Sequence, residues 1–93
     1  MSAPVPIQIP ATLRSECGGR SQLIVSAATV GEALQQLEQN HPAVYRSTCD
    51  ETGAVRRHIH LFVNNDLLKG DNSFETPLDS GDTLFIMPAV SGG

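Results

Sequence analysis

The chain has 93 residues, of which 40% are hydrophobic and 17% are charged. This length and composition suit a single globular domain with a modest core, which we place over residues 1–93. A formal net charge of -4 argues against a nucleic-acid binder, because neutralising phosphates requires clustered Lys and Arg. No window approaches the roughly 18 apolar residues of a membrane span, and the first residues lack the basic and apolar regions of an export signal. We therefore expect a cytoplasmic protein that binds neither nucleic acid nor membranes.

Two short apolar segments near the start predict a β-hairpin. Residues 5–9 alternate between apolar and other side chains, and residues 21–25 form a second candidate strand. Pro6 and Pro10 allow pairing of the first strand only where no backbone donor is needed. Residues 11–19 connect the two strands and end in a turn-prone glycine pair.

The clearest local signal is a helix that begins after Thr29. A capping box is expected there, in which the Thr29 hydroxyl accepts from the Glu32 amide and the Glu32 carboxylate reaches back to the Thr29 amide. Pro42 ends the helix, because it disfavours helical geometry at His41. The helix carries one apolar face, which must cover a sheet and consists of Val30, Ala33, Leu34 and Leu37.

The second half of the chain predicts further strands. Residues 43–57 form an ordered connection that has room for a short helical turn, and residues 58–63 alternate as a strong strand. Residues 67–68 suit a short strand, and a tight turn at 78–82 leads into the last strand, residues 83–87. This order resembles the β-grasp pattern of the α+β class, a mixed sheet of four to five strands packed on one main helix. That pattern implies a last strand lying parallel to the first in the centre of the sheet.

Strand alternation predicts an exposed apolar face. If Leu84 and Ile86 point under the helix, the side chains between and after them point to the open side of the sheet. The same alternation applies to residues 58–63. Large apolar side chains on an open face favour a partner-binding surface, whereas the alternative is that residues 43–57 fold over this face and make it ordinary core. The predicted partner-binding residues are His60, Phe62, Phe85, Met87, Pro88 and Val90.

Two glycines, Gly92 and Gly93, close the printed sequence. Glycine has no side chain and lets a second protein's backbone come close, so such a tail can be threaded into a narrow active site. The alternative is a frayed terminus without a role.

Three segments taken together resemble the ThiS/MoaD family of ubiquitin-like sulfur carriers. The family's recurrent form is a Val-Asn turn, then Leu-x-x-Gly-Asp-x-apolar, then a strand, a proline and a terminal Gly-Gly. The matching segments here are Phe62–Asn65, Leu78–Leu84 and Ile86–Gly93. The connection from Pro42 to His60 is more similar to the MoaD-like carriers of mycobacterial cysteine biosynthesis than to the shorter thiamine carriers.

The resemblance implies a protein co-substrate and not an enzyme. In this family an E1-like enzyme uses ATP and magnesium to adenylate the terminal carboxylate, here that of Gly93. A sulfur donor protein or sulfide then replaces AMP, and the resulting thiocarboxylate gives sulfur to a downstream enzyme of cysteine, thiamine, molybdopterin or related biosynthesis. Gly93 would carry the chemistry and Gly92 would give access to it. The resemblance also implies a flexible tail, residues 89–93, on a folded body, residues 5–88, with no bound cofactor.

Two other functions remain open. The same activated tail would serve a ubiquitin-like modifier that becomes joined to lysine through Gly93, and a β-grasp binding module would have no use for the glycine pair. Metal chemistry has little support, because His58 and His60 could share a strand face but no third ligand is visibly placed. Cys17 and Cys49 are expected as free thiols, as is usual in a cytosolic chain.

Overall fold

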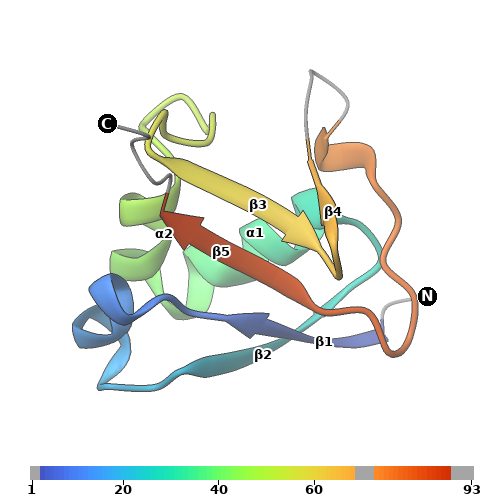
Figure 1. Ribbon diagram of the computed structural model, residues 1–93, viewed down its shortest axis with the longest axis horizontal. Coiled ribbons are helices and arrows are strands. Elements are labelled where there is room, and N and C mark those ends of the chain that lie inside the picture. The colour runs from blue at the N-terminus through green and yellow to red at the C-terminus, as the bar shows by residue number, and fades with distance from the viewer. Residues whose placement is uncertain (1–2, 69–72, 89–93) are drawn as a thin grey trace.

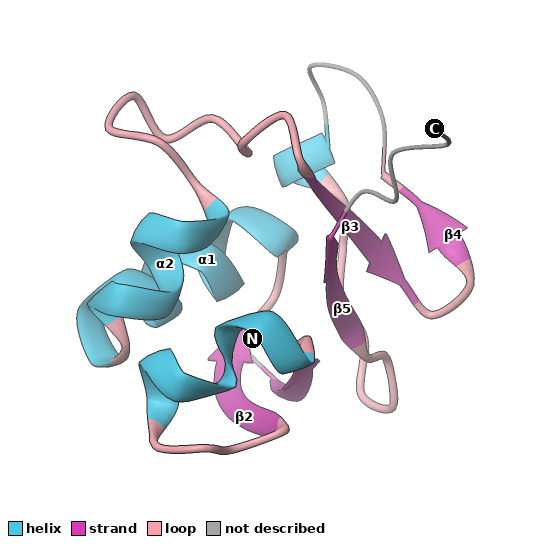
Figure 2. Cartoon of the chain, turned by 60° about the vertical axis from the view of Figure 1, so that its left-hand side comes forward, coloured by secondary structure: helices cyan, strands magenta, loops and turns pink. Residues whose placement is uncertain are grey.

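Five strands form one mixed sheet, in the order β2-β1-β5-β3-β4, and the helices cover one of its sides (Figures 1 and 2). The computed structural model describes residues 3–68 and 73–88. The elements in chain order are β1 (Ala3–Gln8), the 3-10 helix η1 (Ala11–Cys17), β2 (Gln22–Ala27), α1 (Val30–Asn40), α2 (Pro42–Thr48), β3 (Ile59–Val63), β4 (Asp66–Leu67), the 3-10 helix η2 (Ser73–Glu75) and β5 (Leu84–Pro88).

The strand pairing confirms the predicted β-grasp topology. β1 and β2 form the antiparallel hairpin, and β5 lies parallel to β1, with Leu84 opposite Ile7. On its other side β5 pairs antiparallel with β3, so that the last strand occupies the centre of the sheet (Figure 1). The strand β3 begins at Ile59, one residue later than predicted, which places His58 in the preceding turn.

The start of α1 is capped almost as the sequence predicts. The Thr29 hydroxyl accepts from the Glu32 amide at 3.2 Å, which confirms the first half of the capping box. The second half is wrong, because Oε1 of Glu32 accepts from the Ala28 amide at 2.8 Å and not from that of Thr29. A bridge between Thr29 and Pro77 holds the chain extended before the helix, and this presents the Ala28 amide to the first turn.

The connection between α1 and β3 contains a second helix. Pro42 stops α1 but occupies the start of α2, where its missing N–H is not needed and its fixed φ suits a first helical residue. This helix packs against α1 and η1, on the covered side of the sheet (Figure 2). The connection therefore does not fold over the open face as the alternative required, and Met87 there remains 43% exposed.

The core lies between the sheet and α1. The side chains that the alternation placed inside are buried on each long strand, and the apolar face of α1 is buried against them. Neither α1 nor α2 is long and apolar enough to cross a membrane, and no other helix in the described part of the chain is. The core includes Val5, Ile7, Leu23, Val25, Val30, Leu34, Leu37, Ile59, Leu61, Val63, Leu84 and Ile86.

Candidate functional site

Two segments that are far apart in the sequence meet where β3 ends and β5 begins. Nδ2 of Asn64 donates to Oδ1 of Asp82 at 3.0 Å, and the Thr83 amide donates to Oδ1 of Asn64 at 3.1 Å. The Asn64 amide donates to the Thr83 carbonyl at 2.9 Å, and the second carboxylate oxygen of Asp82 accepts from the Asp79 amide at 2.9 Å. We call Asn64, Asp79, Asp82 and Thr83 the clasp.

The clasp explains why an asparagine follows the valine at the end of β3. Asn64 has φ 55°, a left-handed conformation that asparagine tolerates better than most residues, and no other non-glycine residue in the described ranges has a positive φ. Its side chain then bridges to the turn that starts β5. The Val-Asn and Gly-Asp segments therefore have a structural role, because together they fix how the start of β5 is aligned with the end of β3.

Replacing Asn64 with alanine should lower the free energy of unfolding by about 2 kcal/mol, because two side-chain hydrogen bonds are lost and alanine is strained at this φ. Chemical denaturation measures the change. The control is Asn64→Gly, which tolerates the backbone conformation and isolates the loss of the hydrogen bonds. An unfolding free energy equal to that of the unaltered chain would show that the clasp contributes nothing.

The clasp should also make stability depend on acidic pH. The Asp79 amide, and next the Asn64 side chain, hold the pKa of Asp82 below its ordinary value of 3.8. A lowered folded pKa means that the ionised carboxylate stabilises the fold fully above 3.8, and that this contribution is lost as the pH falls through the folded value. The melting temperatures of the unaltered chain and of Asp82→Asn should therefore converge on acidification. A difference that stays constant from neutral pH to well below 3.8 would contradict this role.

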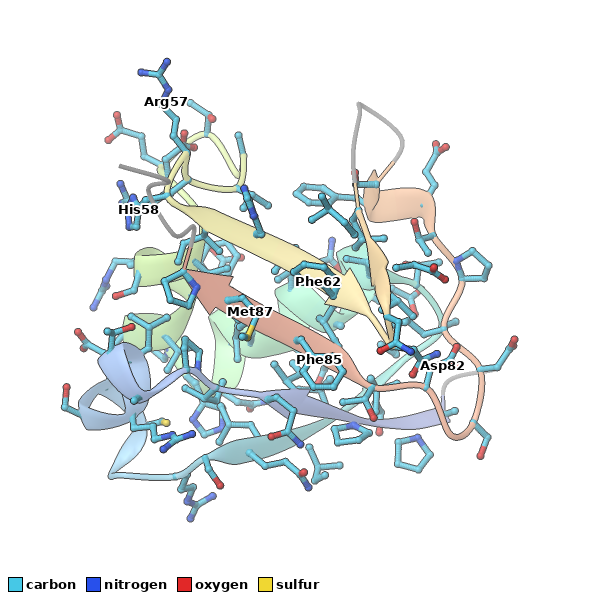
Figure 3. The ribbon with its side chains drawn as sticks, in the orientation of Figure 1. Arg57, His58, Phe62, Asp82, Phe85 and Met87 are labelled. Carbon is cyan, nitrogen blue, oxygen red and sulfur yellow. The ribbon has the colours of Figure 1, made fainter. Side chains whose placement is uncertain are left out.

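The open face of the sheet carries an apolar row that crosses three strands. Phe85 on β5 lies opposite Phe62 on β3, and Phe62 lies opposite Leu67 on β4. Met87, 43% exposed, lies one step further along β5 and opposite His60. Figure 3 shows Phe62 and Phe85 on neighbouring strands, with Met87 toward the end of β5. We call Phe62, Leu67, Phe85 and Met87 the open-face patch.

Sequence reasoning missed Leu67 as a member of this patch. Leu67 is 36% exposed on a strand of two residues, which is too short for its alternation to predict the face on which it lies. Because Leu67 lies directly opposite Phe62, its side chain is on the open face as well. Ile24 on β2 is also exposed on this side, at 59%, but it lies opposite Pro6 and away from the open-face patch.

Part of the predicted site lies outside the described residues. Pro88 is exposed at the end of β5, opposite Ile59, while Val90, Gly92 and Gly93 fall beyond the described range. Five residues follow Pro88 in the sequence, and at about 3.3 Å each their extended reach is roughly 16 Å.

Neither cysteine lies at this site. Cys49 is buried in the core, and its pKa is raised to about 11, first by burial and then by the nearby Asp50 carboxylate. Its thiol is thus a poor nucleophile near neutral pH. Cys17 is half-buried, and its thiol donates to backbone carbonyl oxygens of Arg14 and Arg20. Within residues 3–68 and 73–88 no three His, Cys, Asp or Glu side chains are grouped as metal ligands.

The family model described as the ThiS family matches residues 7–93. The chain belongs to the ThiS family. The sulfur carrier protein CysO of Mycobacterium tuberculosis is 30% identical over 91 residues, which are 96% of this chain and 98% of CysO. The small archaeal modifier protein 3 of Haloferax volcanii is 31% identical over 85 residues, 89% of this chain and 91% of its own.

Solved structures give the same family. A chain of the Amycolatopsis orientalis BexX/CysO complex aligns with a TM-score of 0.81 and 31% identity, over 96% of this chain and 99% of that chain. These matches confirm the predicted resemblance and place the protein among small sulfur carriers and ubiquitin-like modifiers of the ThiS family. The relatives are named as carriers and modifiers, which fits the expectation that this protein is not an enzyme.

Proposed function

We propose that the protein is a sulfur carrier that works through the carboxylate of Gly93, in a chain that ends at that residue. An E1-like enzyme adenylates this carboxylate, a sulfur donor protein or sulfide converts it to a thiocarboxylate, and a downstream biosynthetic enzyme takes up the sulfur. The observation that carries the proposal is the match to the ThiS family, which extends through Gly92 and Gly93. The similarity to the sulfur carrier CysO over 96% of this chain supports it.

The chemistry needs two partner-catalysed steps. A carboxylate oxygen of Gly93 attacks the α-phosphorus of ATP and releases pyrophosphate, which gives an acyl-adenylate. With sulfide as the donor, its sulfur attacks the acyl carbon and AMP leaves with the bond electrons, so that a thiocarboxylate remains. ATP and magnesium belong to the activating partner, and this chain binds no cofactor of its own.

The fold supports separate roles for the folded body, which would dock on the partner, and for the tail, which would react. The clasp and the pairing on both sides of β5 position the central strand, and Pro88 at its end leads directly into residues 89–93. Gly92 would let the partner's backbone approach closely. The open-face patch, with His60, Pro88 and Val90 around it, would supply the docking contacts. In the open-face patch Leu67 and Met87 are exposed, and Phe62 and Phe85 are half-buried. Accessible apolar side chains gathered on one face are a common mark of a protein interface.

A second candidate function is protein modification. The similarity to the small archaeal modifier protein 3 over 89% of this chain favours it. The acyl-adenylate of Gly93 would be the shared intermediate, and a lysine amine of the target would finally take the place that sulfur takes in the carrier. The two functions therefore differ in the nucleophile and not in the activation step.

Intact mass after reaction separates these proposals. The chain is incubated with its activating enzyme, ATP, magnesium and sulfide, and parallel reactions omit ATP or sulfide. Replacement of one oxygen by one sulfur, only in the complete mixture, is the result expected for a carrier. Covalent adducts on other proteins in a mixture with candidate targets would instead support the modifier. An unchanged mass with the cognate activating enzyme, when that enzyme preparation has been shown to be active, would overturn both.

A further inference from the structure

A hollow of about 420 Å³ lies beside the first half of β3, next to the open-face patch. We call it the β3 hollow. Figure 3 shows Arg57 projecting from the turn that precedes β3, near the end of β5. The β3 hollow combines an apolar lining with basic side chains; the residues that matter here are Arg56, Arg57, His60, Leu61, Leu68 and Phe74.

The described residues that line the β3 hollow carry charge of one sign. No Asp or Glu is among the described residues that line it, although the whole chain has a net charge of -4. A second hollow nearby differs, because its lining mixes Glu38, Asp50 and Glu51 with Arg46 and Arg56. The second hollow thus combines charges of both signs, whereas the described lining of the β3 hollow contributes basic groups alone.

Arg56 and Arg57 contribute differently to this charge. Nε of Arg56 donates to the Arg46 carbonyl at 2.8 Å. The pKa of Asp50 is lowered first by hydrogen bonds from Thr52, and the charge of Arg56 adds to this effect. Part of Arg56 is therefore engaged within the fold. Arg57 is exposed, and it lines the β3 hollow but not the second one. Arg57 is accordingly the residue whose substitution changes the charge of the β3 hollow most directly.

The position of the β3 hollow links it to the tail and to the patch. Ile59, which lines the hollow, lies opposite Pro88, the last residue of β5. His60 also lines it and lies opposite Met87 of the open-face patch. A partner that covers the open-face patch and takes up residues 89–93 therefore lies next to the β3 hollow.

We propose that the β3 hollow receives an acidic segment of the activating enzyme, with its carboxylates against Arg57 and His60 and an apolar side chain against Leu68 and Phe74. The proposal rests on the proposed function and adds the recognition chemistry of its first partner. Complementary charge at the rim of an interface speeds association and selects partners more than it changes the chemical step. In this proposal Arg57 is a specificity residue for docking and has no part in the chemical step.

The test measures initial rates of adenylation against the concentration of the chain. Arg57→Glu should raise KM about fivefold or more and leave kcat unchanged at saturation. Arg57→Lys keeps the charge and should remain close to the unaltered chain. Arg20→Glu, in the exposed turn before β2, is the matched control, because it makes the same change in net charge outside the hollow. Added salt should raise KM for the unaltered chain more than for Arg57→Glu.

The outcomes separate this proposal from the proposed function. An unchanged KM for Arg57→Glu, or an equal rise for Arg20→Glu, overturns the docking role while adenylation itself stands. No adenylation of the unaltered chain overturns both. Thermal unfolding checks that the variants are folded, and if Arg57→Glu is not, Arg57→Ser takes its place with an expected KM increase of about twofold.

Discussion

Replacing Gly92 with leucine should reduce adenylation of the chain by about 100-fold or more, because a branched side chain beside Gly93 blocks the approach that in-line attack requires. Thermal unfolding should stay the same. The buried apolar residues of the described core all precede Pro88, so a change at position 92 leaves the contacts among these residues in place. Initial rates of pyrophosphate release give the activity, and circular dichroism gives the unfolding curve.

Gly92→Ala is the matched control for this prediction. A single methyl group should slow adenylation less than the leucine side chain does, so the Gly92→Ala rate should lie between those of the unaltered chain and Gly92→Leu. Deleting Gly93 should abolish the reaction, because it removes the residue whose carboxylate reacts. A Gly92→Leu chain that is adenylated at the normal rate, or that unfolds at a much lower temperature, would contradict the proposed use of the tail.

Replacing Phe85 with serine should weaken binding of the activating enzyme by about 30-fold, because Phe85 lies on β5, the middle strand of the sheet, and opposite Phe62 of the open-face patch. Large aromatic residues at the middle of an interface commonly account for about 2 kcal/mol or more of its binding energy. Titration calorimetry with the activating enzyme measures the dissociation constant. The alternation along β5 predicts a much smaller effect on the core, since Ile86 and not Phe85 is fully buried.

Ile24→Ser provides the control on the same side of the sheet. Ile24 is 59% exposed, apolar and located on β2, at the opposite edge of the sheet from β4. Its replacement should leave the dissociation constant unchanged if binding depends on the open-face patch. Equal weakening by both variants would mean that exposed apolar area in general, and not this patch, determines binding.

The helix α1 and the alternation of the long strands were predictable because each depends on local spacing. The apolar face of α1 follows the helical period, and Leu84 and Ile86 alternate with Phe85 and Met87 as a half-buried strand requires. Where α2 lies, the sequence allowed only a short helical turn within residues 43–57, because Pro42 ends one helix and also begins the next. The partner of the Glu32 carboxylate was also predicted wrongly, since it depends on the pairing of Thr29 with Pro77, which lies far along the chain.

The candidate site also combines residues that local spacing predicts with residues that only the folded structure brings together. Phe62, Phe85 and Met87 were placed on the open face by alternation, whereas Leu67 could be added only from its cross-strand register with Phe62. The clasp and the β3 hollow each join segments that are distant in sequence. No local pattern predicts such contacts, although the Val-Asn and Gly-Asp segments that form the clasp were recognisable as family motifs.

The most direct test of the central claim is the mass of the last tryptic peptide after reaction. No Lys or Arg follows Lys69, so trypsin releases residues 70–93 as one peptide. After incubation with the activating enzyme, ATP, magnesium and sulfide, fragmentation of this peptide should locate one sulfur-for-oxygen replacement at Gly93. Replacement at any other residue, or an unmodified peptide from a chain whose adenylation has been measured, would contradict sulfur carriage by the Gly93 carboxylate.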